Sequence, residues 1–206
     1  MVLRLDVASR KAGVEAVIET HRDTCTETSE KTEALQRGFR NASGGRDLLL
    51  LLDFSHHAVV KHLDPPFAPR LLTNHDLIRR TRWHHLRPFN GHHAQIPVLA
   101  PDGSIALEMT EWLAFADEIL QLLRNSPLPE IWICPEIGPV RGGYGLSAFP
   151  PSWGQALTLL VLLKLSWERN IITQTSASLI RGRIPILAGA QIPFDSKPTP
   201  RIRRHR

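Results

Sequence analysis

Four side chains that can bind a metal ion each stand at the end of a short apolar run. They are Glu19, Asp53, His85 and Glu136. Three carboxylates and one imidazole give a mostly oxygen donor set, which suits Mn, Mg, Co or Zn and is too hard for copper or an iron-sulfur cluster. The pattern therefore indicates a divalent-metal site, provided that the fold brings the four ends together.

Two plainer readings compete with a metal site. An acidic residue at a strand end often caps the next helix, and for any one of the four alone that role is the commoner one. Nine of the ten histidines lie between His21 and His93, and we expect most of them to be bystanders, His62 and His75 above all. A zinc site made of clustered histidines stays open, although no HExxH or paired CxxC motif supports it. The recurrence of all four donors at run ends favours the metal site.

The apolar runs alternate with helix-like segments. Buried strands are predicted at 14–18, at 48–52, in a short run that ends at His84 and His85, and at 131–134. Helices are predicted at 28–40, 69–82 and 110–124, followed by a buried final helix at 153–167. Strands that alternate with helices predict a parallel α/β sheet, whose strands all open at their carboxyl ends onto one face. Such a face would gather the four donors.

The spacing of the donors is that of a barrel of βα units. Glu19 and Asp53 are 34 positions apart, Asp53 and His85 are 32 apart, and a long Pro- and Gly-containing loop extends the last interval, to Glu136, to 51. A (β/α)8 barrel of about 250 residues has roughly 31 residues per unit. The predicted fold class is therefore α/β, with about four βα units.

Four segments, taken in order, resemble one family. They are ETHRDT (19–24), LLLDFSHHAVV (50–60), HLRPFNGHHAQIPV (85–98) and PEIGPVRGGYGLSAFPPSW (135–153). Together they are similar to the second half of xylose isomerase-like TIM barrels of the sugar phosphate isomerase/epimerase type. The resemblance covers roughly residues 3–168 and implies strands five to eight of the barrel.

The resemblance implies a metal site and a reaction. In that family one divalent ion is held at the positions that match Glu19, Asp53, His85 and Glu136. The two glutamates would also exchange the proton, so Glu19 and Glu136 are the expected catalytic residues of an isomerase or epimerase that works through an enediolate. The D-x-x-H and H-x-R patterns imply that His56 and Arg87 bind a sugar or related hydroxy-carbonyl substrate, and Gln95 matches a glutamine in the following loop.

The resemblance also stops short at both ends. Strands one to four have no counterpart, so we expect domain 1–168 to be a partial barrel. The extension at 169–206 matches nothing in the family, and its basic end, 197–206, is expected to be disordered. A non-catalytic barrel fragment that acts through assembly with another copy is therefore the first alternative function.

Charge and apolar content limit the partners. The formal net charge is +5, but five of the 25 lysines and arginines lie in residues 197–206, and the remaining 20 equal the 20 acidic residues. We therefore expect no nucleic-acid partner, although a metal-dependent endonuclease of the related barrel type, with more histidine ligands, is the second alternative. No apolar stretch reaches the 20 or so residues of a membrane span, and no secretory signal is visible. A cytoplasmic protein with free Cys25 and Cys134 is expected, and a homo-oligomer stays open.

Overall fold

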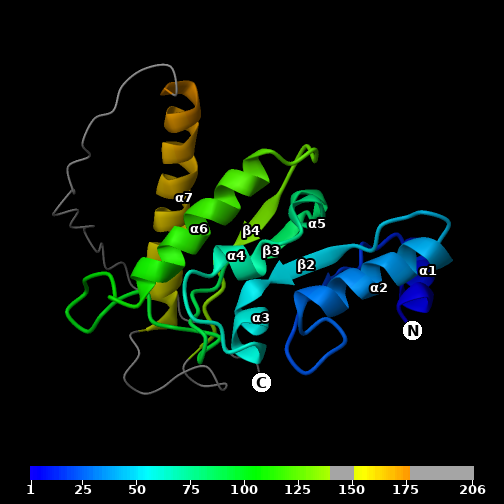
Figure 1. Ribbon diagram of the computed structural model, residues 1–206, viewed down its shortest axis with the longest axis horizontal. Coiled ribbons are helices and arrows are strands. Elements are labelled where there is room, and N and C mark those ends of the chain that lie inside the picture. Colours follow the sequence, from blue (N-terminus) through cyan, green and yellow to red (C-terminus); the bar gives the residue numbers. More distant parts are fainter. Residues whose placement is uncertain (140–150, 177–206) are drawn as a thin grey trace, which may run out of the picture.

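The computed structural model describes residues 1–139 and 151–176, which form a four-stranded parallel sheet with helices (Figure 1). The strands are β1 (Ile18–Glu19), β2 (Leu50–Asp53), β3 (Trp83–His85) and β4 (Trp132–Cys134). They pair in chain order, each parallel to the next. Glu19 pairs with Leu51, Asp53 with His85, and His85 with Cys134. The predicted α/β class with a parallel sheet is confirmed, and within the described residues the sheet is open, with β1 and β4 as its edge strands.

The helices come between and around the strands. The longer ones are α1 (Val2–Lys11), α2 (Ser29–Ala42), α6 (Met109–Arg124) and α7 (Ser152–Ser176). The short ones, α3 (Phe54–Val60), α4 (Ala68–Leu71) and α5 (His75–Arg80), all lie between β2 and β3. Thr28 caps α2, because its side chain accepts a hydrogen bond from the Lys31 N–H. No helix among the described residues is long and apolar enough to cross a membrane.

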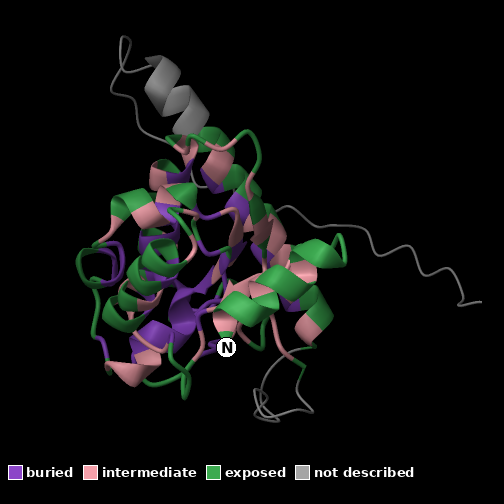
Figure 2. Ribbon diagram, turned by 90° about the vertical axis from the view of Figure 1, so that its right-hand side faces the viewer, coloured by how far each residue is buried: buried purple, intermediate pink, exposed green. Residues whose placement is uncertain are grey.

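The core lies between the sheet and the helices, where buried residues are concentrated (Figure 2). Successive strand residues point to opposite faces, so each strand has one set of side chains in this core. Leu50, Leu52 and His84 are buried there. α6 contributes the largest share, with Trp112, Ile119 and Leu120 almost fully enclosed, and it lies beside α7 (Figure 1).

The other face of the sheet is open. Leu49 is 44% exposed and Trp132 49% exposed, while Trp83 and Leu51 are half-buried. Trp83 and Trp132 stack on each other across β3 and β4, with ring centroids 5.4 Å apart. By the same alternation this open face is the one that carries Asp53 and His85, two residues after Leu51 and Trp83. The metal-binding candidates therefore stand at the end of a sheet face without a helical cover.

Several predicted elements differ from the observed ones. The single helix predicted at 69–82 is wrong: α4 and α5 are separate, since Asn74 starts α5 by accepting from the Leu77 N–H. The helix α3, directly after Asp53, was not predicted.

The final helix also differs from its prediction. It is not buried throughout, because Trp153, Leu157, Val161 and Leu165 are 48–75% exposed. It continues to Ser176, across the predicted boundary between 168 and 169. The rest of the predicted extension, including 197–206, lies outside the described residues. Cys25 and Cys134 are free, as expected, and both are exposed.

Candidate metal centre

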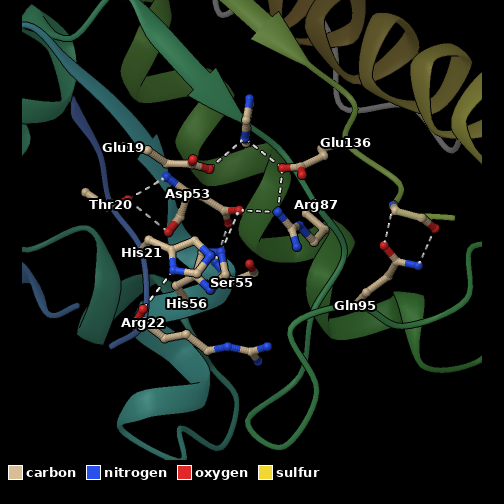
Figure 3. Close-up of polar contacts among 12 residues, drawn as sticks. Glu19, Thr20, His21, Arg22, Asp53, Ser55, His56, Arg87, Gln95 and Glu136 are labelled. Atoms are coloured by element: carbon tan, nitrogen blue, oxygen red, sulfur yellow. Dashed lines mark hydrogen bonds and ion pairs between the residues drawn. The ribbon is translucent and has the colours of Figure 1, made fainter. Parts of the chain in front are cut away.

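The four predicted donors meet at one point. Glu19 and Asp53 end β1 and β2, His85 ends β3, and Glu136 follows β4 by two residues. One ligand atom from each can be chosen so that all four lie within 4.8 Å of one another. The arrangement follows from the parallel sheet, because all four strands bring their carboxyl ends to the same edge (Figure 3). The predicted cluster is confirmed, and it can hold a metal ion.

The contacts of His85 have the spacing of ligand atoms. Its Nδ1 lies 2.7 Å from Glu136 Oε2 and 3.2 Å from Glu19 Oε1. Neither Nδ1 nor Glu136 Oε2 makes a hydrogen bond within the described part of the chain, although both are buried. Two ligands about 2.1 Å from one ion at a right angle lie about 3 Å apart. Donor atoms at this separation fit a divalent cation between them once His85 has lost its proton.

Asp53 is the most firmly held donor. Its backbone N–H donates to Thr20 Oγ1 at 2.7 Å, and the Thr20 hydroxyl donates to the Asp53 carbonyl at 3.1 Å. Its Oδ1 accepts from the Ser55 N–H and so caps α3, the plainer role weighed above. Its Oδ2 is left for Arg87, whose Nη2 donates to it at 2.9 Å. Asp53 thus serves as helix cap and as candidate ligand at once, one oxygen for each.

Arg87 joins two of the donors. The same Nη2 atom that binds Asp53 lies 2.6 Å from Glu136 Oε2 (Figure 3). The Arg87 side chain is 2% exposed. A buried guanidinium needs anionic partners, and here they are two candidate ligands. Arg87 therefore offsets part of the repulsion among the three carboxylates.

The cluster shifts the pKa values of its own members. Burial alone would lower the pKa of His85, but the adjacent carboxylates of Glu136 and Glu19 outweigh it and raise the pKa to about 9. Burial would raise the pKa of Glu136, yet His85 and Arg87 lower it to about 2. The pKa of Glu19 is lowered by His85 in the same way. Without a metal ion, His85 is therefore protonated and, with Arg87, balances the carboxylates of the site.

Asp53 shifts in the opposite direction. Its complete burial raises its pKa to about 6, although Arg87 and the Ser55 hydrogen bond favour the charged form. A group whose charge is so costly to bury gains most from a cation placed beside it. A cation bound beside Asp53 would therefore lower its pKa.

His56 lies next to Asp53 but is covered. Its Nε2 is 3.5 Å from Asp53 Oδ2, its side chain is fully buried, and neither ring nitrogen has a hydrogen-bond partner among the described residues. Burial lowers its pKa to about 3, so the ring is neutral. The ring of His21 rests on it, with centroids 3.9 Å apart. The His21 ring is therefore part of what covers His56.

No role was predicted for His21 or Thr20. His21 Nδ1 lies 2.7 Å from the Arg22 carbonyl, which orients the ring over His56. A signal was available, because both residues directly follow or adjoin Glu19 in ETHRDT. Thr20 was overlooked because its partner, Asp53, is 33 positions away.

The other buried histidines are occupied elsewhere. His57 Nε2 lies 3.0 Å from the Thr26 carbonyl, and His84 Nε2 lies 2.9 Å from the Thr81 carbonyl. Burial lowers both pKa values, that of His84 to about 4. Over residues 1–139 and 151–176, the cluster contains His85 as its single histidine.

Gln95 fixes the chain that follows β4. Its Nε2 donates to the Gly138 carbonyl at 3.2 Å, and its Oε1 accepts from the Gly138 N–H at 2.6 Å (Figure 3). Gly138 lies two residues after Glu136, so the pair restrains the segment that carries this donor. The match of Gln95 to the family's loop glutamine did not predict these hydrogen bonds.

Comparisons with known proteins add no relative. No protein-family model, no curated protein and no solved structure matches the chain.

Proposed function

We propose that the chain binds one divalent metal ion, Mn, Mg, Co or Zn, and acts as an isomerase or epimerase on a sugar, a sugar phosphate or a related hydroxy-carbonyl compound. The observation that carries the proposal is the meeting of Glu19, Asp53, His85 and Glu136 at the carboxyl ends of adjacent parallel strands. Those residues, in that order, are the ones implied by the resemblance to xylose isomerase-like barrels.

The proposal includes the barrel. Four parallel strands in chain order, with helices on one face and the donors at the carboxyl ends, fit half of a (β/α)8 barrel. In such barrels the site lies at this end of the strands and is built from the loops that follow them. The open face that carries Leu51 and Trp83 corresponds to the barrel interior.

The residues divide the work of moving a proton between neighbouring carbons. A bound divalent ion supplies Lewis acidity that stabilises negative charge on a substrate oxygen. Glu19 and Glu136 lie on either side of His85 Nδ1, so their carboxylates can take and return the proton on opposite sides of the site. Glu19 is the more accessible of the two, with a side chain 39% exposed against 29% for Glu136.

Arg87 and His56 orient the substrate in this proposal. Arg87 already holds two donors and presents a planar group that can hydrogen-bond an oxygen bound beside them. His56 is neutral and has two unbonded nitrogens, so it can give or accept one hydrogen bond to a hydroxyl once His21 has turned away.

Metal binding is the first test. Calorimetry with Mn²⁺ or Co²⁺ should give one ion per chain, and Asp53→Asn should weaken binding at least tenfold. Asparagine also caps helices, so α3 keeps its first turn in this variant. Asp102→Asn is the matched control, since Asp102 accepts from the Ser104 N–H in a loop away from the site. Two or three ions per chain would favour the endonuclease alternative instead, and no binding would remove the metal site.

Proton exchange is the second test. Hydroxy-carbonyl sugars incubated with the metal-loaded protein in D2O should gain deuterium beside the carbonyl carbon, as seen by NMR. Glu136→Gln should abolish the exchange when saturated with metal, with occupancy measured in the same sample. Exchange at the wild-type rate in this loaded variant would remove the role of Glu136.

A second candidate is a metal-binding half barrel without activity. The observation that favours it is the open face of the sheet, where Leu49 and Trp132 are about half exposed close to the site. A catalytic site of this kind works by excluding water, and the described residues cover one side only. Metal binding at one ion per chain without any proton exchange would select this candidate.

A further inference from the structure

An uncovered apolar surface continues from the metal cluster along the sheet. It is lined by Val17, Leu51, Trp83, Trp132 and Cys134, and together with Glu15 and His85 these form an open depression of about 390 Å³. The polar members stand at its two ends, and the middle is apolar. Trp132 in this depression and Leu49 on the same face are 49% and 44% exposed, so large apolar side chains are left open to solvent here. These five residues, with Leu49, make up the open face of the sheet described above.

Both edges of the same sheet are also free. Over the residues described, β1 pairs only with β2, and β4 pairs only with β3. Each outer edge therefore presents backbone N–H and C=O groups that a further strand can bind. A partner that covers all of this surface must pair with both edge strands and bury the open face at the same time.

The flanking helices show the same lack of a partner. α7 exposes Trp153, Leu157, Val161 and Leu165, which recur every four residues and so form one stripe along the helix. α1, beside α2 at the opposite end of the sheet, buries none of its residues. The two ends of the molecule thus offer an apolar helix face and a weakly attached helix.

We propose that the occupant of the open face is a second copy of this chain. Two copies related by a two-fold axis along the strands place β4 of each beside β1 of the other. Eight parallel strands then close into a barrel, a size whose interior is just filled by side chains. All four free edges disappear, and the open faces of both copies become the interior.

Two features select a second copy over an unrelated partner. A single strand from another protein would cover one edge and leave the face exposed, whereas a second copy covers both edges and the face at once. The assembly is also closed, as most homo-oligomers are. In the ring, α7 of one copy would lie over the new junction between its own β4 and β1 of the other copy. In the single chain, α1 occupies that space beside α2, so α1 of the other copy would have to move. α1 is the helix free to give way, since it has no buried residue.

This inference stands on the sheet and holds whether or not the site catalyses the proposed reaction. Its first test is the mass in solution by light scattering, for which we expect twice 23.2 kDa. Trp132→Glu should convert the dimer to a monomer, because it places a charge in the new interior at a position that a monomer leaves half exposed. Leu107→Glu, at a residue 84% exposed outside the open face, is the control and should stay dimeric. A monomer at all concentrations, or a Trp132→Glu variant that stays dimeric, would overturn the proposal.

A disulfide tests the arrangement without disturbing the fold. In a Cys25→Ser background, Val17→Cys and, separately, Glu15→Cys place a thiol just before β1, facing the same side as Cys134 on β4. Within one chain these strands are three spacings apart, roughly 14 Å, too far for a disulfide. Mild oxidation should therefore give a covalent dimer with at least one of the two variants, while Leu107→Cys should not. Failure of both variants to link would exclude the ring.

Discussion

Gln95 holds Gly138 through both ends of its side-chain amide, and Gly138 lies two residues after the candidate ligand Glu136. We expect Gln95→Met to keep the volume of the side chain and lose both hydrogen bonds. Each neutral hydrogen bond is worth about 0.5–1.5 kcal/mol, and freeing Glu136 by about 1.4 kcal/mol weakens metal binding about tenfold. Calorimetric titration with Mn²⁺ measures the change.

A matched variant separates positioning from general stability. Gln36, on α2, is also buried, and its Oε1 accepts from the Leu48 N–H at 2.9 Å. Gln36→Met should lower the unfolding midpoint about as much as Gln95→Met does. It should leave the metal dissociation constant unchanged. Equal loss of affinity in both variants would show that Gln95 acts on stability alone.

The sequence predicted the site better than its surroundings. Glu19, Asp53 and His85 were predictable because a parallel sheet fixes where strand ends meet, whatever the side chains around them. The roles of Thr20 and Gln95 depend on partners 33 and 43 positions away, and no periodicity encodes such pairs. For Asp53, helix capping and metal binding were weighed as alternatives, yet its side chain caps α3 and is also a candidate ligand.

The fold was predictable to the same partial extent. The three- and four-residue spacing of α6 predicted its helix, because burial on one side leaves a regular pattern. The continuous apolar run at 48–52 predicted β2, but as a strand covered on both faces, and this was wrong because Leu49 is 44% exposed. The break between α4 and α5 was missed, although Asn74 is a favoured first residue of a helix. The exposed stripe on α7 was missed for a physical reason: an apolar face looks the same in sequence whether its partner is the core or another surface.

Metal affinity should rise with pH. A metal ligand must be deprotonated, and the pKa of His85 is raised to about 9 by Glu136 and Glu19, against the effect of burial. From about pH 6 to 9 one proton is displaced, so the dissociation constant should fall about tenfold per pH unit. Below about 6, where Asp53 also takes a proton, the dependence should steepen. Titrations in buffers of different ionisation enthalpy at pH 7.5 count the released proton, and a count of zero would contradict the assignment of His85.

Without metal, stability should fall as pH rises above neutrality. The folded-state pKa of His85, about 9, exceeds its ordinary value of 6.5, so its contribution is complete below 6.5 and is lost as pH rises to about 9. We expect the melting temperature in EDTA to drop on the order of 5 °C across this window. His85→Asn should remove that slope, and an unchanged slope in this variant would place its cause elsewhere.

Gly91 and Gly38 should respond to alanine in opposite directions. A Cβ at Gly91 would lie 2.1 Å from the Leu63 carbonyl oxygen, a backbone atom that moves only if the chain does. Gly91→Ala should therefore lower the free energy of unfolding by about 2–3 kcal/mol. At Gly38, inside α2, nothing lies within 4 Å of the added carbon, so Gly38→Ala should raise it by about 0.5–1 kcal/mol through the lower backbone entropy of the unfolded chain. Urea unfolding of both variants measures the two shifts, and a neutral Gly91→Ala would mean that the loop carrying His92 and His93 does not pack against Leu63.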